Sequence, residues 1–209
     1  MIVIDNFIQD NALLNEIKND DTFFGPNGNF MWWDGWWNST ANTCKKRLIE
    51  YLWKHHSPAP SYDNISGFEY WTGVYGDGFP NTDLGWHFDK DEEQWKRTGG
   101  KDGGELILPE VGTVYYPRDT EFEGGYLEIE RANGEVERIE PKYNRLVIFD
   151  AGGVRHRVTS VKNGVRYAIA INLWSKVPVL AQEGNMTIEE PKLPIVHSER
   201  IGGVKGGLK

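Results

Sequence analysis

The chain has 209 residues, a formal net charge of −8 and 39% hydrophobic residues, a composition typical of folded globular proteins. All-β domains of this length commonly form one unit, so we expect a single domain over residues 1–209. There is no apolar run long enough for a membrane span and no signal-peptide pattern in residues 1–20, so we expect no membrane partner and a cytoplasmic location. The acidic balance disfavours nucleic-acid binding, which requires clustered Lys and Arg. A single cysteine, Cys44, excludes an internal disulfide and is expected to be buried.

Two helices are expected in the N-terminal part of the chain. Residues 10–19 fit a short helix capped by Asp10, because apolar residues recur there at helical spacing. A second helix is expected to run from a cap at Ser39 or Thr40 to about His55, before a Ser-Pro pair that ends it. We expect the first helix to pack on the outside of the core.

The segment 30–37 between these helices contains Trp32, Trp33, Trp36 and Trp37. Aromatic faces on a surface bind sugars, prolines or bases by stacking, so the segment is a candidate binding platform. The same side chains can instead fill the space between the helices and the core. We favour this second interpretation, a hydrophobic plug.

From residue 67 the pattern changes to short β-branched and aromatic runs separated by Gly, Pro, Asn and Asp, which is typical of a sandwich or barrel. The expected strands are 67–75, 84–90, 111–118, 124–130, 135–140, 145–150, 155–161 and 165–174, with 104–108 as a possible addition. A jelly roll has about eight strands. We therefore expect a mainly β fold with flanking α-helices, in which 1–66 form a helical support, 67–174 a jelly-roll core, and 175–209 a wrapping C-terminal arm with a loose end.

The triplet His87-Phe88-Asp89 places an imidazole and a carboxylate two residues apart on an expected strand, and therefore on the same face. His156, near the start of the seventh expected strand, can complete a set of two histidines and one carboxylate. Such a set leaves coordination positions open on Fe(II), so we predict a metal site at these residues. By itself a His-x-Asp triplet is more often structural or solvated. The acidic run 90–93 after it is expected to be a solvated loop.

Arg166 lies in the apolar run 164–174, which is expected to be a buried strand. A buried arginine needs an anionic partner, and its planar guanidinium can hold a carboxylate through two hydrogen bonds. The distal carboxylate of a 2-oxo diacid is such a partner. The alternative is an acidic side chain of the protein itself.

Alternation along the last strand offers a separate argument for a pocket. If Arg166 points inward, Ala168, Ala170 and Asn172 point inward too, which places small residues and one amide around a ligand. A tight hairpin at 163–164 would turn the arginine away from the metal site, so we predict that this turn crosses between two sheets. Asn172 contacts the ligand or is a satisfied amide of the core.

These features together resemble the 2-oxoglutarate and Fe(II)-dependent dioxygenases, in particular their prolyl 4-hydroxylase-like branch. The resemblance covers about residues 67–174, and its pieces follow one another in the order of the family. They are His87-Phe-Asp89, Thr113-Val-Tyr-Tyr-Pro117, Glu123-Gly-Gly-Tyr-Leu-Glu128, Leu146-Val-Ile-Phe149, His156-Arg-Val158 and Gly164-Val-Arg-Tyr167.

The resemblance implies a double-stranded β-helix in which the second and seventh strands pair and bring the three metal ligands together. Arg166 would approach from the eighth strand. Tyr116 would place its hydroxyl on the distal carboxylate of 2-oxoglutarate, with Tyr115 as the fallback, and Asn172 is a further candidate for cofactor binding. Tyr70 and Tyr75 precede His87 at a spacing that departs from the family, so neither is assigned a role.

The cofactors implied are Fe(II), 2-oxoglutarate as co-substrate and O2, with ascorbate as a candidate reductant. The activity implied is that of an oxidoreductase, a hydroxylase that acts on an aliphatic C–H bond of a prolyl or other amino-acid side chain, free or in a peptide, and releases succinate and CO2. Asp89 favours hydroxylation, because related halogenases have a small residue in its place.

Two alternatives stay open at this point. One is a non-catalytic jelly-roll module that binds ligands through its tryptophans. The other is a nucleic-acid base demethylase, which the acidic balance and Asn172 disfavour because that family typically carries a second arginine at this position. The partner is therefore expected to be a small molecule or a peptide. The oligomeric state is open.

Overall fold

The structure is a computed structural model that describes residues 1–24, 29–56 and 63–186. Its larger sheet has the order β1-β9-β5-β12-β3-β2, with strands Ile2–Ile4, Leu146–Phe149, Val111–Tyr115, Val165–Trp174, Gly67–Gly76 and Met31–Trp33. The smaller sheet has the order β4-β10-β7-β8, with strands Leu84–His87, His156–Val158, Leu127–Glu130 and Val136–Ile139. Two short strands, β6 (Glu123–Gly124) and β11 (Val161–Lys162), pair with each other. All pairings between these strands are antiparallel.

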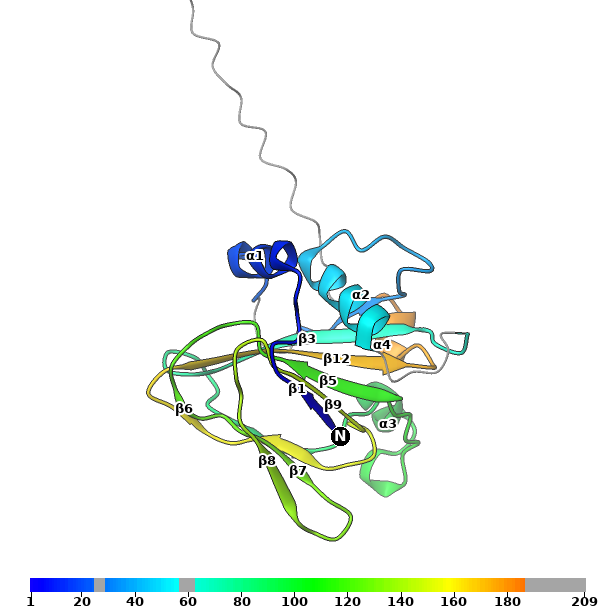
Figure 1. Cartoon of the computed structure of the whole chain (residues 1–209). Helices are drawn as coiled ribbons and strands as arrows, with labels where there is room; N and C mark the ends of the chain where they lie inside the picture. The colour runs from blue at the N-terminus through cyan, green and yellow to red at the C-terminus, as the bar shows by residue number, and fades with distance from the viewer. Residues whose placement is uncertain (25–28, 57–62, 187–209) are drawn as a thin grey trace, which may run out of the picture.

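The molecule has three layers. Helices α1 (Asn11–Asn19) and α2 (Cys44–His56) cover the outer face of the larger sheet, and the smaller sheet lies against its inner face (Figure 1). A short helix α3 (Glu92–Arg97) and the 3-10 turn η1 (Gly100–Asp102) follow β4, and α4 (Val179–Gln182) follows β12. This arrangement confirms the expected jelly-roll core with flanking helices.

Alternation along β12 explains the layering. Ile169, Ile171 and Leu173 are fully buried in the core between the larger sheet and the helices. The intervening side chains, among them Ala168, face the smaller sheet and contribute to the second core. Because successive side chains of a strand point to opposite faces, this one strand serves both cores.

The predicted start of the first helix is confirmed, and the predicted start of the second helix is wrong. Asp10 caps α1 by accepting hydrogen bonds from two backbone amides of its first turn. Helix α2 begins at Cys44, four or five residues after the expected caps Thr40 and Ser39, because Thr43 takes that role: its hydroxyl accepts from the backbone amide of Lys46 at 3.3 Å. A Ser or Thr at any of these positions satisfies the same local rule, so local sequence could not choose among them.

The tryptophan segment forms the expected hydrophobic plug. Trp33 is buried on β2 and packs against Phe68 of β3, with ring centroids 5.9 Å apart. Its indole N–H donates to the Ser39 hydroxyl at 2.8 Å, which gives Ser39 a partner outside the helix. Trp36 also stacks on Phe68, with ring centroids 5.7 Å apart, and lies 6.2 Å from Trp33. An aromatic platform at Trp33 is therefore excluded.

Several expected strand boundaries are wrong. The strand expected over 84–90 ends at His87, those over 124–130 and 155–161 each divide into two short strands, and 104–108 forms none. The run 90–93 is not a solvated loop: Asp91 is buried and caps α3, accepting from the amide of Gln94 at 3.0 Å. Each divided strand contributes to two sheets: β7 and β10 belong to the smaller sheet, whereas β6 and β11 pair with each other. The chain therefore has to break its hydrogen-bonding pattern between the two parts.

The turn at 163–164 crosses between sheets, as predicted. Strand β11 before it pairs with β6, whereas β12 after it pairs with β3 and β5. Asn163 and Gly164 both have positive φ, 55° and 146°. The expected C-terminal arm includes α4, and its residues 187–209 lie outside the described residues. Within the described ranges, none of the helices has the length and apolar character needed to cross a bilayer.

Candidate active site

Strands β4 and β10 bring the three predicted metal ligands together. His87, the last residue of β4, lies directly opposite His156, the first residue of β10. Asp89 follows β4, and its Oδ1 lies 3.5 Å from Nε2 of His87 and 3.6 Å from Nε2 of His156. One donor atom of each residue lies within 4.8 Å of the other two. Two imidazole nitrogens and a carboxylate oxygen at this separation suit a divalent iron ion.

Each imidazole is oriented by a backbone carbonyl on its far side. Nδ1 of His87 lies 2.8 Å from the carbonyl oxygen of Gly85, and Nδ1 of His156 lies 3.2 Å from that of Val154. A carbonyl can only accept, so each Nδ1 carries the proton and each neutral Nε2 keeps its lone pair. Both lone pairs are thus available for a metal in the space beside Asp89.

Burial keeps His156 neutral. Removal from water lowers the pKa of His156, an effect that the Asp89 carboxylate opposes and the neighbouring His87 reinforces. The His156 ring packs edge-on against Phe149 at 5.0 Å. A neutral, firmly packed imidazole is the form that binds a metal.

Two hydrogen bonds fix the position of Asp89. Its backbone amide donates to the carbonyl oxygen of Ala151 at 3.0 Å. Its Oδ2 accepts a 3.0 Å hydrogen bond from the side-chain amide of Asn172 on β12. Asn172 therefore points into the site, as alternation from Arg166 predicted, but its contact is with the carboxylate ligand.

Arg166 lies on β12 on the same inward face and is 2% exposed. Its guanidinium lies between two rings, 5.0 Å from the centroid of Tyr116 and 5.7 Å from that of Tyr75. One terminal nitrogen lies 3.4 Å from the Tyr116 hydroxyl, and Nε has no hydrogen-bond partner. Gly125 lies against the side chain, with φ +65° and no room for a Cβ, which would lie 2.8 Å from the arginine Cδ.

No acidic side chain of the described residues forms an ion pair with Arg166. A buried guanidinium with an unpaired N–H is costly to the folded protein unless a ligand satisfies it. The paired-arginine alternative therefore has no support within the described part of the chain, and the site fits a bound carboxylate.

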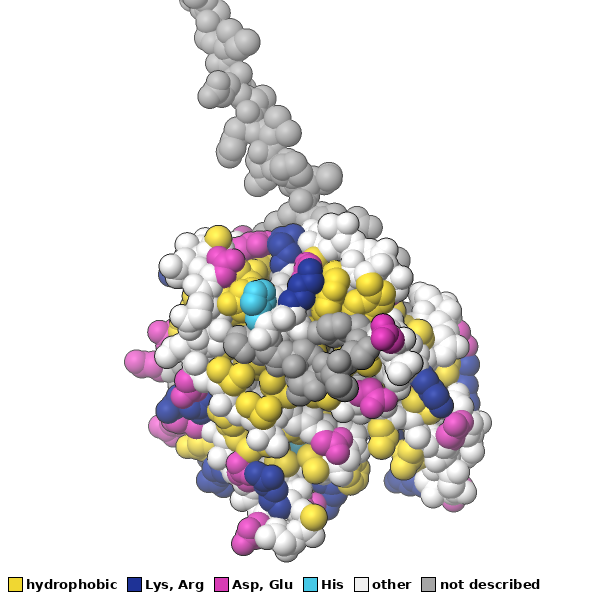
Figure 2. Space-filling view, turned by 45° about the vertical axis from the view of Figure 1, so that its right-hand side comes forward, with side chains coloured by type: hydrophobic (Ala, Val, Ile, Leu, Met, Phe, Trp, Pro, Cys, Tyr) yellow, Lys and Arg dark blue, Asp and Glu magenta, His cyan; other side chains and the backbone are white. Residues whose placement is uncertain are grey.

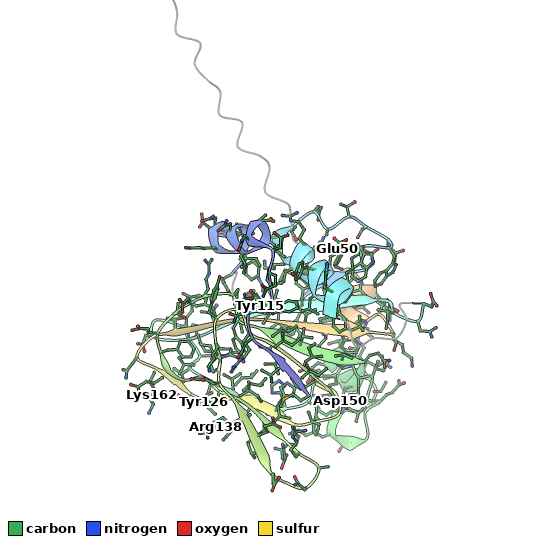
Figure 3. All side chains as sticks on the ribbon, viewed as in Figure 1. Glu50, Tyr115, Tyr126, Arg138, Asp150 and Lys162 are labelled. Carbon is green, nitrogen blue, oxygen red and sulfur yellow. The ribbon has the colours of Figure 1, made fainter. Side chains whose placement is uncertain are left out.

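The two candidate tyrosines point to opposite faces of the larger sheet. Tyr116 faces Arg166 and belongs to the core between the sheets. Tyr115 points to the helices, where its hydroxyl donates to Oδ1 of Asn144 at 3.0 Å (Figure 3). Only Tyr116 is placed to contact a ligand of Arg166.

The site residues line two adjoining cavities. The smaller cavity, about 50 Å³, is bounded by Arg166 and by the three predicted metal ligands, His87, Asp89 and His156. The larger, about 370 Å³, shares the walls of His87 and Asp89 and extends away from the arginine. The arginine and the metal-ligand cluster thus border one continuous space, with Ala168 and Ala170 leaving room between them.

Sequence reasoning missed three residues of strand β3. Tyr75 lies opposite Arg166 in the sheet, and Trp71 and Glu69, four and six residues before it, line the larger cavity with it. Alternation along 67–75 would have found them if one inward residue had been known. Both alternating sets of this strand contain aromatic groups, so the sequence did not show which set faces the cavity.

The comparisons with known proteins agree with this geometry. Residues 71–174 match the 2OG-Fe(II) oxygenase superfamily. The chain belongs to that superfamily, whose members use Fe(II), 2-oxoglutarate and O2. No curated protein matches the sequence.

Two solved structures share the fold at low identity. A prolyl-4-hydroxylase from Pseudomonas putida is 18% identical over 83% of each chain, with a TM-score of 0.52. A 2OG-Fe(II) oxygenase family oxidoreductase from Burkholderia pseudomallei is 12% identical over 80% of each chain, also with a TM-score of 0.52. These two structures agree with the jelly-roll fold, and the oxygenase class rests on the family match over residues 71–174.

Proposed function

We propose that the protein hydroxylates an aliphatic C–H bond of a prolyl or other amino-acid side chain, free or in a peptide, and releases succinate and CO2. The observation that carries this proposal is the buried guanidinium of Arg166, which lacks an acidic partner among the described residues and borders the same space as the metal-ligand cluster. A dicarboxylate can join the two ends of that space. The likeness to the Pseudomonas putida enzyme suggests the prolyl substrate.

In this proposal His87, Asp89 and His156 hold the iron. Arg166 holds the distal carboxylate of 2-oxoglutarate through two hydrogen bonds, and the Tyr116 hydroxyl contacts the same carboxylate. Asn172 positions Asp89 through its 3.0 Å hydrogen bond. A direct contact between Asn172 and the co-substrate stays a prediction.

When bound, iron and 2-oxoglutarate supply the oxidising power for C–H hydroxylation through decarboxylation of the co-substrate. The side chains of the protein orient the metal ligands and exclude water from the site. The Nδ1–H groups of the two histidines stay on backbone carbonyls, which keeps both Nε2 atoms directed at one point. Apolar walls such as Phe149 and Leu127 exclude water from the smaller cavity.

The alternatives have less support. The burial of Trp33 removes one of the four tryptophans from the aromatic platform of a non-catalytic module. On the face drawn in Figure 2, Lys and Arg side chains are dispersed among Asp and Glu and form no basic patch, which disfavours a nucleic-acid substrate.

Ligand binding is tested first. Fe(II) and 2-oxoglutarate, added together under argon, should raise the melting temperature of the wild-type protein and quench its tryptophan fluorescence. Arg166→Met should lose the response to 2-oxoglutarate. Arg118→Met, at an arginine bonded to the Lys18 carbonyl outside both cavities, should keep it. No response of the wild type to either ligand would favour the binding module.

Turnover is tested next. Succinate release is measured with and without candidate amino acids and peptides, and mass spectrometry looks for a product 16 Da heavier. Succinate without a heavier product supports the site and leaves the substrate to be found. A bound co-substrate with no succinate under any condition would contradict an oxygenase.

A further inference from the structure

Glu69 is a largely buried carboxyl group on the wall of the larger cavity, outside the roles assigned above. It lies on β3 directly opposite Asn172 of β12, whereas Tyr75 of the same strand lies opposite Arg166. Six residues of extended strand separate Glu69 from Tyr75, so it lies toward the end of the site that is remote from the arginine. It therefore faces the part of the cavity left for the substrate.

Among the described residues, Glu69 forms no ion pair. Burial, and next the negative charge of Asp89, raise its pKa to about 8, an effect that the Asn172 amide partly offsets. A carboxyl in this state lacks a counter-ion. With this pKa the carboxyl holds its proton at neutral pH, and a cation placed beside it would supply the missing counter-ion and favour the charged form.

The charge around the larger cavity is one-sided. Besides Glu69, the acidic residues that line it are Asp89, Asp91, Glu92 and Glu93. Two of these acidic groups have cationic partners: Glu92 pairs with Lys90, whose ammonium lies 4.7 Å over the ring of Trp95, and Glu93 pairs with Arg97 at 2.7 Å. A positively charged ligand is therefore attracted to this cavity and an anionic one is repelled.

Two aromatic rings form the wall beside Glu69. Trp71, two residues further along the same face of β3, packs against Phe30 with ring centroids 5.0 Å apart. Phe30 is 40% exposed, which places this pair at the accessible part of the cavity. The face of an aromatic ring attracts an organic cation and packs well on an aliphatic chain.

We propose that the substrate carries an alkylammonium group that binds between the Glu69 carboxyl and the Trp71 ring, with its aliphatic chain directed toward His87 and Asp89. This inference rests on the proposed function, because it assumes that the larger cavity receives the substrate of an oxygenase. The ammonium belongs to a free amino acid or to a side chain within a peptide. A prolyl residue inside a peptide carries no such charge.

The test compares probes that differ in one charged group. Nα-acetyl-L-lysine methylamide and Nα-acetyl-L-norleucine methylamide share a four-carbon side chain, and only the first ends in an ammonium. L-Norleucine methylamide, in which only the carboxyl group is blocked, adds an α-ammonium without a charged side chain. Affinities are measured by calorimetry under argon, on the full chain loaded with Fe(II) and 2-oxoglutarate.

The wild type should bind one ammonium probe about 10- to 100-fold more tightly than the blocked norleucine, the range expected for one charge-assisted contact in a dry site. A preference for the blocked lysine would identify a side chain in a peptide. A preference for L-norleucine methylamide would identify the α-amine of an amino acid. Glu69→Gln should remove most of this preference, whereas Glu123→Gln, the same charge change on the exposed β6 strand, should keep it.

Equal affinity for all three probes in a wild type that binds Fe(II) and 2-oxoglutarate would overturn the inference and leave the proposed function standing. A preference that persists in Glu69→Gln would also overturn it. A protein that binds neither iron nor 2-oxoglutarate would instead contradict the proposed function. The comparison of probes on the wild type decides the matter even if Glu69→Gln does not fold.

Discussion

The side-chain amide of Asn172 donates a 3.0 Å hydrogen bond to Oδ2 of Asp89, across 83 positions of sequence. Asn172 belongs to the larger sheet, and Asp89 follows a strand of the smaller one. The bond therefore ties the two sheets together at the candidate iron site. It leaves Oδ1, the oxygen nearest both histidines, free for a metal.

Asn172→Leu should weaken Fe(II) binding about 10- to 100-fold, because loss of a bond that orients a metal ligand typically has this effect. The measurement is a titration with Fe(II) under argon, followed by tryptophan fluorescence. Asn81→Ala is the control, since Asn81 lines the larger cavity with no contact to Asp89. Unchanged affinity in Asn172→Leu would show that the bond does not position Asp89.

The two neighbouring tyrosines should respond differently to loss of the hydroxyl. Tyr116→Phe should raise the dissociation constant of 2-oxoglutarate about 5-fold and change stability little. Tyr115→Phe should lower the free energy of unfolding by about 1 kcal/mol, because its bond to Asn144 is buried, and leave 2-oxoglutarate binding unchanged. Calorimetric titration and urea unfolding of both variants test this. The opposite assignment of effects would make Tyr115 the ligand-binding residue.

Glu69 should make the metal-free protein less stable as the pH rises. Its pKa is about 8 in the folded protein, above the ordinary value of 4.5. Between these values the folded protein holds a proton that the unfolded chain has released, so the free energy of unfolding falls with increasing pH. From pH 5 to pH 8 the wild type should lose about 3–4 kcal/mol relative to Glu69→Gln, measured by urea unfolding with a chelator present. Parallel pH profiles of the two proteins would refute this.

Trp33 should contribute to stability and not to binding. Trp33→Ala should lower the free energy of unfolding by about 3–5 kcal/mol, because a large buried side chain is removed from the plug. Trp37→Ala should cost less, since Trp37 is 37% exposed. Urea unfolding measures both, and 2-oxoglutarate binding by the folded variants is the control. A stable Trp33→Ala protein that no longer binds ligands would revive the aromatic platform.

Local patterns predicted most of the β core. Alternation and turn residues gave the long strand β12 at its observed start and end, and β3 within one residue. The helix α3 was missed because its six residues follow a stretch of strands and carry mainly charged side chains. The sequence did not identify Thr43 as the helix cap, because Ser39, Thr40 and Thr43 satisfy the same local capping preference.

The sequence by itself determined which residue types were available and which of them share a face. In an extended strand the side chains alternate as a consequence of covalent geometry, so inward Arg166 required inward Asn172 before any contact was known. The order of the motifs along the chain indicated the oxygenase family.

Only the tertiary structure decided which of these side chains meet. The pairing of β4 with β10 sets His87 opposite His156, and the pairing of β12 with β3 sets Glu69 beside Asn172. These registers depend on the packing of two sheets and the helices, which joins residues far apart in sequence. The bond from Asn172 to Asp89 follows from that packing, as does the place of Glu69, which has no ion-pair partner among the described residues.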